Sequence, residues 1–360
     1  MNAYRLIALA LVVAVHIGLR PAEAQNKIYL AEYKFEDPKL YRMDVNGGSV
    51  EELNVFPTAD WLPLGLQLDT AAGKIYWTHG SFNQGAIRRA DLDGSNLETI
   101  VAGLTNPRGL ALDLEANKAY WSDTQDDKMY RINLDGTGME AIVDTGHQYG
   151  RPRLDLAGGK VYYGNFGTHE IRRCNLDGSD NELLFADNVD QANGIALDLD
   201  AGKLYWVDMQ TSFVTNYVAR ANLDGTDFEL LYQGLPTSSG LVNIEIDVEV
   251  GAIYWADEIT AEEKGVWRAN LDGSDAQRIY ESPEGWNAGA IVLLIGESSC
   301  EGDANGDGEV DPLDSGYVLA RFGCPVGTGD PSCDAADQNG DGTVDPLDSG
   351  FVLARFGTCN

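Results

Sequence analysis

The chain has 360 residues, of which 44% are hydrophobic and 23% charged, and its formal net charge is −32 at pH 7. These fractions are ordinary for a globular protein. The acidic balance argues against binding to nucleic acid or to an anionic membrane surface, because like charges repel.

Residues 1–24 have the pattern of a secretory signal peptide. Arg5 precedes an apolar run at residues 6–19, and residues 22–24 (AEA) place small side chains at a cleavage site. The apolar run is too short to serve as a membrane span. We therefore expect cleavage before Gln25 and a secreted or cell-surface protein without a transmembrane anchor.

Residues 25–297 repeat a pattern of four short strands. An aromatic strand starts every 42 to 49 residues, at Ile28, Ile75, Ala119, Val161, Leu204 and Ile253. A turn such as DLDGS or NLDGT follows the next strand in each copy. This period and strand number are typical of β-propeller blades. The six copies predict a mainly β fold, a six-bladed propeller.

The order of the strands predicts how the ring closes. The first copy lacks a strand before Ile28, whereas the apolar strand at residues 290–295 follows the last copy. That strand is expected to complete the first blade, which leaves no open edge along the ring.

Two sets of repeated residues have structural interpretations. We expect the Tyr-Trp pairs to form the core between blades. One Asp also recurs before a hairpin in five blades, at Asp69, Asp113, Asp155, Asp198 and Asp247. These residues are either a ring of metal ligands or caps of the hairpin turns, and capping is the simpler interpretation. Cys174, alone in this region, is expected to be a free, buried thiol.

The aromatic strands read YLAE, YWTH, YWSD, YYGN, YWVD and YWAD. They resemble the YWTD, or LDL-receptor class B, repeat of six-bladed propellers, over residues 26–297. The motif Asp is present at Asp123, Asp208 and Asp257, and is replaced by Glu32, His79 and Asn165. The EGF-like module that usually follows this propeller in animal receptors is missing, so receptor function does not carry over.

The loops that precede the inner strands vary between blades and are the candidate ligand-binding surface. Large aromatic, arginine and amide side chains of the kind that anchor interfaces occur there. They are Trp61, Arg108, Tyr149, Arg151, Asn193 and Trp286. The expected ligand is a protein, peptide or glycan, and the alternative is that these side chains only pack the loops.

Residues 298–360 contain two nearly identical copies of a calcium-loop pattern, at residues 303–323 and 337–357. Oxygen donors fall at positions 1, 3, 5, 7, 9 and 12, and glycine at position 6, as in EF-hand loops. The donors are Asp303, Asn305, Asp307, Glu309, Asp311, Asp314, Asp337, Asn339, Asp341, Thr343, Asp345 and Asp348. We expect two Ca²⁺ ions, a helix at 315–322 and at 349–356, and folding that depends on calcium.

This duplicated loop-helix pattern resembles a type I dockerin. The resemblance implies docking to a cohesin-like or cell-surface partner, often in polysaccharide degradation, and suggests a bacterial source. Pro312-Leu313 and Pro346-Leu347 depart from the usual recognition residues, which leaves the partner class open. The four cysteines of this module allow three pairings. Our first choice is Cys300–Cys359, which flank the module, with Cys324–Cys333.

Two functions remain open from the sequence. One is a non-enzymatic exported adaptor. The other is a propeller hydrolase acting on lactones, esters or polysaccharides and carrying a dockerin. The inner strands begin mainly with apolar residues and offer only Asn243 and Glu245 as a polar pair. No catalytic residues can be assigned from spacing, so the adaptor is favoured.

Overall fold

The computed structural model describes most of the propeller region and little else. The described residues are 26–33, 38–53, 56, 63–80, 84–144, 150–209, 216–234, 240–257, 264–283, 287–294, 309–310, 344 and 357–358. The predicted signal peptide, the C-terminal helices, the disulfides and the calcium-ligand side chains lie outside this set. Across the described ranges no helix is long and apolar enough to span a membrane.

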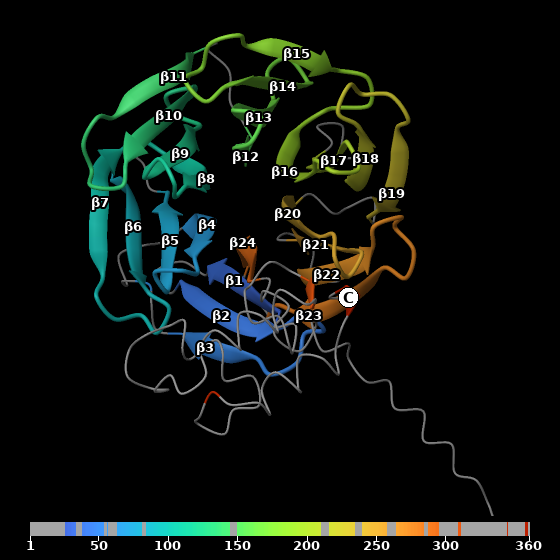
Figure 1. The fold of residues 1–360 in the computed structure, drawn as a ribbon, viewed down its shortest axis with the longest axis horizontal. Coiled ribbons are helices and arrows are strands. Elements are labelled where there is room, and N and C mark those ends of the chain that lie inside the picture. Colours follow the sequence, from blue (N-terminus) through green and yellow to red (C-terminus); the bar gives the residue numbers. More distant parts are fainter. Residues whose placement is uncertain are drawn as a thin grey trace, which may run out of the picture.

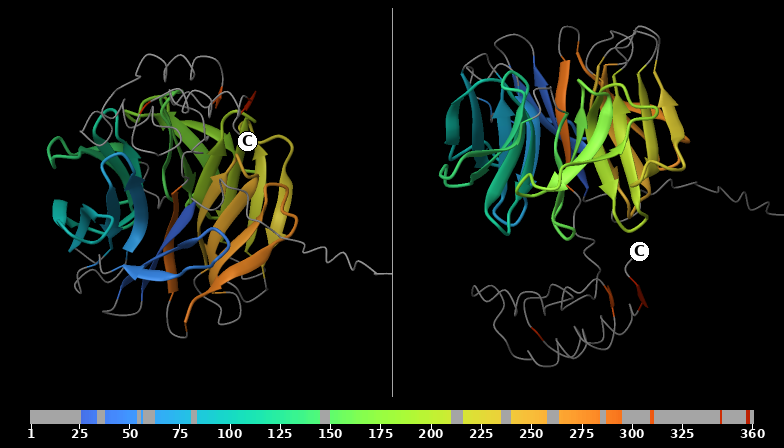
Figure 2. Two further views of the ribbon diagram at one scale, coloured as in Figure 1. Left: turned by 60° about the horizontal axis from the view of Figure 1, so that its bottom comes forward. Right: turned by 90° about the horizontal axis from the view of Figure 1, so that it is seen from above.

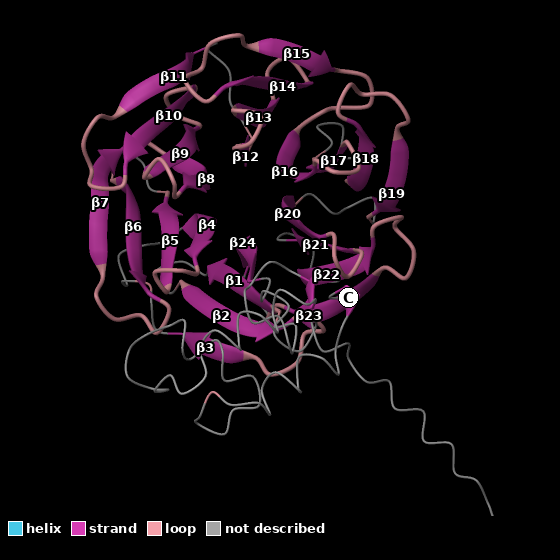
Figure 3. Ribbon diagram, in the orientation of Figure 1, coloured by secondary structure: helices cyan, strands magenta, loops and turns pink. Residues whose placement is uncertain are grey.

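Six four-stranded antiparallel sheets surround a central axis, which confirms the six-bladed propeller (Figure 1). Every described element is a strand, and in side view the strands run between the two ends of the ring (Figures 2 and 3). We number the blades in chain order and give their strands from the axis outward.

Blade 1 is β24 (Asn287–Leu294), β1 (Lys27–Tyr33), β2 (Lys39–Asp44) and β3 (Glu51–Leu53). Blade 2 is β4 (Pro63–Asp69), β5 (Lys74–His79), β6 (Gly85–Asp91) and β7 (Glu98–Leu104). Blade 3 is β8 (Pro107–Asp113), β9 (Lys118–Asp123), β10 (Lys128–Asn133) and β11 (Glu140–Asp144).

Blade 4 is β12 (Arg153–Asp155), β13 (Lys160–Asn165), β14 (Glu170–Asn175) and β15 (Glu182–Phe185). Blade 5 is β16 (Ala192–Asp198), β17 (Lys203–Asp208), β18 (Tyr217–Asn222) and β19 (Glu229–Gln233). Blade 6 is β20 (Leu241–Asp247), β21 (Ala252–Asp257), β22 (Gly265–Asn270) and β23 (Gln277–Glu281). A short pair, β25 (Glu309–Val310) and β26 (Gly357–Thr358), lies in the C-terminal region.

The ring closes as the strand order predicted. β24 pairs antiparallel with β1 from Lys27 opposite Leu294 to Tyr33 opposite Asn287, with a bulge between Ala31 and Glu32. The orange β24 therefore lies beside the blue β1 in Figure 1.

The core lies between blades. The indole rings of Trp77, Trp121, Trp206 and Trp255 are fully buried. Trp77 of blade 2, for example, belongs to one cluster with Ala31 and Leu40 of blade 1. Each sheet thus buries its faces against its neighbours, and the predicted role of the aromatic pairs is confirmed. Cys174 is a free, buried thiol, as expected.

The repeated Asp residues cap the hairpins between inner and second strands. In each case one carboxylate oxygen accepts a hydrogen bond from the backbone N–H three residues later. The N–H donors and the N···O distances are Ala72 to Asp69 (2.9 Å), Ala116 to Asp113 (2.8 Å), Gly158 to Asp155 (2.7 Å), Ala201 to Asp198 (2.9 Å) and Val250 to Asp247 (3.2 Å). The capping interpretation is confirmed, and among the described residues no three His, Cys, Asp or Glu gather to hold a metal.

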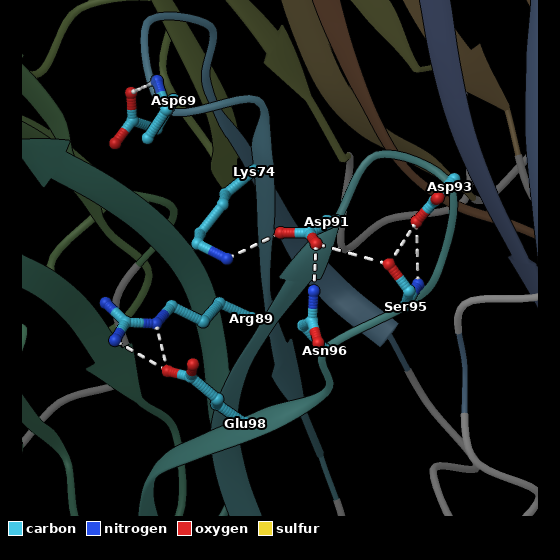
Figure 4. Close-up of polar contacts among 9 residues, drawn as sticks. Asp69, Lys74, Arg89, Asp91, Asp93, Ser95, Asn96 and Glu98 are labelled. Atoms are coloured by element: carbon cyan, nitrogen blue, oxygen red, sulfur yellow. Dashed lines mark hydrogen bonds and ion pairs between the residues drawn. The ribbon is translucent and has the colours of Figure 1, made fainter.

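The second turn of each blade is held by its own side chains, as blade 2 shows in Figure 4. Asp91 accepts hydrogen bonds from Lys74 at 2.6 Å and from Asn96 at 2.5 Å. Asp93 accepts from the backbone N–H of Ser95 at 2.8 Å and from its hydroxyl at 2.6 Å. These Ser95 bonds lower the pKa of Asp93. The DLDGS pattern therefore encodes a closed turn.

The glycine of this turn also sets the distance between blades. Gly178 has φ +83°, and a Cβ there would lie 1.8 Å from the carbonyl oxygen of Ile142, on β11 of the preceding blade. Gly47, Gly136 and Gly273 meet the preceding blade's outer strand in the same way. Glycine is required at these positions because a left-handed turn and a close backbone contact coincide.

We predict that Gly178→Ala lowers the free energy of unfolding by about 3 kcal/mol, because it adds a steric clash to the left-handed strain. Gly159→Ala is the matched control, since Gly159 has φ +66° but no atom within 4 Å of its Cβ position. The control should lose only about 1 kcal/mol. Urea unfolding of both variants measures the difference, and equal losses would contradict the clash.

Candidate functional site at the mouth of the central channel

The loops that precede the inner strands lie at one end of the ring, and the capped hairpins lie at the other, because neighbouring strands in each blade alternate in direction. We call the first set the rim loops. The inner strands β24, β4, β8, β12, β16 and β20 surround the axis (Figure 1). Each inner strand is the edge of its sheet. Some of its backbone N–H and C=O groups therefore face the channel and have no hydrogen-bond partner on a neighbouring strand.

Arg151 satisfies some of these groups. It precedes β12 of blade 4, and its Nε donates to the carbonyl oxygen of Val242 at 2.6 Å, on β20 of blade 6. Its Nη2 donates to the carbonyl oxygen of Gly289 at 2.9 Å, on β24 of blade 1. Only 8% of Arg151 is exposed. The side chain therefore crosses the channel and links three blades.

Arg153 forms a second layer in the channel. Its Nε donates to the carbonyl oxygen of Ile195 at 2.9 Å, and its Nη2 bonds Glu245 Oε1 at 2.7 Å. In the same region Asn243 Nδ2 donates to the carbonyl oxygen of Ile291 at 2.5 Å. Arg153 is the first residue of β12, which has only three residues, and Arg151 lies two positions before it. The guanidinium groups of both arginines donate hydrogen bonds to carbonyl oxygens of other blades.

The arginines fill the axis. The cavity left beside them has a volume of about 10 Å³ and is lined by Gly65, Gln67, Arg151, Arg153 and Glu245, among others. That volume is about enough for one water molecule. Gly109 packs directly against Arg151. A Cβ at this position would lie 2.5 Å from the Cα of Arg151, so a larger residue would not fit. Among the described residues, the axis at the level of Arg151 and Arg153 thus has no room for a ligand of appreciable size.

The motif carboxylates anchor the rim loops. Asp123 accepts from the backbone N–H of Asn106 at 2.9 Å, and Asp208 accepts from those of Asp190 at 3.0 Å and Gln191 at 3.1 Å. Both carboxylates are buried. Burial raises the pKa of Asp208 to about 6, and the two backbone N–H groups oppose this only in part. These residues position the rim rather than contact a ligand.

An elongated groove opens beside the rim at blade 5. Its volume is about 440 Å³, and it is lined by Asn188, Val189, Asp190, Tyr217, Phe228, Leu230 and Gln233. Phe228 and Leu230 are 37% and 50% exposed. The Tyr217 hydroxyl donates to the carbonyl oxygen of Asn188 at 2.6 Å, which holds the rim loop against β18. The groove thus combines apolar and polar side chains along β18 and β19.

The low-density lipoprotein receptor repeat class B family matches residues 73–114. The matched stretch runs from the capped hairpin of blade 2 through β8. The chain carries an LDL-receptor class B repeat. The aromatic strand β5, which ends at His79, lies within the matched residues.

Two other proteins align with parts of this chain. Protein cueball of Drosophila yakuba is 30% identical over 90 residues, which are 24% of this chain and 14% of cueball. The human low-density lipoprotein receptor-related protein 5-like protein is 41% identical over 71 residues, 19% of this chain and 28% of that protein. The chain thus aligns with well under a third of either relative.

Solved structures share the propeller fold of this chain. A chain of the nidogen/laminin complex superposes with a TM-score of 0.62 at 23% identity, covering 74% of this chain and 98% of that chain. TolB from Acinetobacter baumannii superposes with a TM-score of 0.57 at 14% identity, covering 70% of this chain and 62% of that chain. At these identities the likeness shows the propeller architecture alone.

The structure places three of the six candidate ligand-binding residues. Arg151 and Asn193 lie together, since the backbone N–H of Arg151 donates to the carbonyl oxygen of Asn193 at 2.7 Å, and both residues are buried. Arg108 is half-buried, and its Nε donates to Thr124 at 3.2 Å. Trp61, Tyr149 and Trp286 lie outside the described residues.

Sequence reasoning missed Arg153 as an axial residue, and it missed that Arg151 turns inward. A signal was present, because blade 4 begins its inner strand with Arg-Pro-Arg where the other blades have mainly apolar residues and glycine. The predicted polar pair is in place, but Glu245 bonds Arg153 and Asn243 bonds β24. Both side chains are thus engaged in contacts within the ring.

We predict that Arg151→Ala lowers the free energy of unfolding by about 2–4 kcal/mol, because buried carbonyl groups on two blades lose their donor. Arg89→Ala is the control: Arg89 pairs with the half-exposed Glu98 at 2.6 Å on the outside of blade 2. An exposed pair of this kind contributes up to about 1 kcal/mol. Chemical denaturation compares the two, and a loss at Arg151 no larger than at Arg89 would refute its bridging role.

Proposed function

We propose that the chain is an exported, non-enzymatic adaptor. Its propeller binds a partner protein at the rim and at the groove of blade 5, and its C-terminal module docks to a cohesin-like or cell-surface partner in a calcium-dependent way. The signal-peptide pattern at residues 1–24 and the acidic net charge support export and a protein partner rather than nucleic acid.

The observation that carries this proposal is the occupied axis. Arg151 and Arg153 bond carbonyl groups of several blades, and the space beside them holds about one water. With the axis filled at this level, we place the binding surface at the rim, where loop sequences differ between blades. The 440 Å³ groove adds exposed Phe228 and Leu230 next to polar groups, the mixture found at protein interfaces.

The similar proteins point in the same direction. One of them is named as a receptor-related protein, and another is a chain of a nidogen/laminin complex. The same type of propeller therefore takes part in a protein complex there. For this chain we infer a protein or peptide ligand ahead of a glycan.

The calcium module rests on the chemistry of its donors. Each loop supplies carboxylate and amide oxygens at EF-hand spacing. Val344, directly after the seventh position of the second loop, is 2% exposed, and β25 pairs with β26 so that Glu309 lies opposite Thr358. The pairing of β25, in the first loop, with β26, near the C-terminal end, favours a compact module. So does the burial of Val344 in the second loop. Twelve acidic residues against two arginines in residues 300–360 would repel one another without cations.

We predict that the full chain binds two Ca²⁺ ions in isothermal titration calorimetry, and that the double variant Asp303→Ala/Asp337→Ala binds neither ion tightly. Asp330→Ala, which changes an acidic residue outside both loops, should retain both ions. Capture of a cohesin-like protein should require calcium and fail with the double variant. Unchanged stoichiometry in the double variant would remove the EF-hand assignment.

We predict that the propeller captures its own partner whether calcium or a chelator is present. Leu230→Glu should abolish this calcium-independent capture from exported proteins, because it places a charge in the groove. Leu156→Glu is the matched control, since Leu156 is 46% exposed in the β12–β13 hairpin at the opposite end of the ring. Equal capture by both variants would exclude the groove, and turnover of lactones, esters or polysaccharides by the intact chain would favour the hydrolase instead.

A further inference from the structure

Glu32 occupies the seam where the ring closes. It lies near the end of β1, opposite Ala288 of β24 and Lys39 of β2, directly after the bulge between Ala31 and Glu32. It stands where other blades have the motif Asp, and none of its surface is exposed. The strands β1 and β24 come from opposite ends of the propeller sequence, so this seam is the one place where closure depends on a distant pairing.

The carboxyl of Glu32 is held differently from the motif Asp residues. Asp123 and Asp208 each accept backbone N–H groups, as described above. Glu32 Oε2 is 3.4 Å from the Tyr280 hydroxyl, a long contact, and Oε1 has no hydrogen-bond partner among the described residues. The buried hydroxyl of Ser282 lies close enough to lower the pKa of this carboxyl, although less than burial raises it. A buried carboxylate with so few donors is unfavourable, whereas the protonated carboxyl is less so.

The groups that face Glu32 come from three neighbouring elements. Tyr280 and Ser282 lie at the end of β23, and Lys264 precedes β22 and bonds Asn287 Oδ1 at 3.0 Å. Lys39, opposite on β2, is ion-paired with Glu52 at 2.5 Å. Burial dominates and raises the pKa of Glu32 to about 7, against weaker effects of Ser282, Tyr280 and Lys264.

We propose that Glu32 makes the β24–β1 seam of blade 1 a proton-dependent closure of the ring. The seam is tight while the carboxyl is protonated, and it opens more readily once the carboxyl ionises. Binding of a proton to Glu32 favours the paired state of β1 and β24, and loss of the proton favours their local opening. An exported protein meets changes in external pH directly, so such a seam would couple rim stability to the surroundings.

The direction in which seam closure depends on pH follows from the pKa of Glu32 in the open and the closed seam. In an open seam Glu32 regains its ordinary pKa of 4.5, whereas in the closed seam the value is about 7. Between these values the closed seam holds a proton that the open seam releases. Closure therefore weakens as the pH rises from about 4.5 to about 7 and changes little above that. These two values correspond to about a 70-fold larger opening equilibrium at pH 8 than at pH 5.

Hydrogen–deuterium exchange of the full chain, corrected for intrinsic exchange rates, tests this proposal peptide by peptide. In the wild type, amides of β1 and β24 should lose protection between pH 5 and pH 8 far more than those of β8 and β9. Glu32→Gln should flatten this profile because its side chain does not titrate. Asp208→Asn, at the equivalent position of blade 5, should leave the pH profile of the seam intact.

Tyr280→Phe provides a second test if Glu32→Gln folds poorly. Loss of the Tyr280 hydroxyl should raise the midpoint of the seam's pH profile, because the carboxylate loses a donor. A wild-type profile that is the same in all blades would overturn the proposal. So would a Glu32→Gln variant that keeps the wild-type pH dependence.

Discussion

A blade of four strands can bury its two faces only against the blades on either side, so the propeller is stable only as a closed ring. Closure depends on β24 pairing with β1 along the whole length of β1. The same requirement explains where the large side chains are. Trp77, Trp121, Trp206 and Trp255 lie between neighbouring sheets, and each would face water if the next sheet were removed.

Much of this fold could be predicted because the determinants are local and repeated. The Asp that caps each hairpin acts on a backbone group three residues away, and the Asp-Gly turn closes on its own side chains. Such interactions leave a regular trace in the sequence, so blade number, strand order and closure could all be derived. The glycines of these turns are also required for contacts between blades, which the sequence does not show. Gly178 is needed for its contact with Ile142 of another blade as much as for its turn.

The candidate site was harder to predict because its contacts are not repeated. Arg151 and Arg153 occur once, in the blade with the shortest inner strand, and their partners lie about 40 to 140 residues away. From sequence alone an arginine in a loop is more readily assigned to a surface than to an axis. The exposed edges of the inner strands supply the reason for its burial, since unpaired carbonyl groups attract the donors of a guanidinium group. The axis at this level is thereby filled by side chains of the ring itself.

The position of the motif carboxyl shows how one repeat can serve two purposes. Asp123 and Asp208 are short enough to be enclosed by the backbone N–H groups of their rim loops, which offset part of the cost of burial. Glu32 is one methylene longer and lies after a bulge, where it faces the hydroxyls of Tyr280 and Ser282 instead of backbone N–H groups. The same burial that is structural in blades 3 and 5 therefore favours a neutral carboxyl at the seam. Because the seam is where two distant strands must meet, a change of charge there acts on the closure of the whole ring.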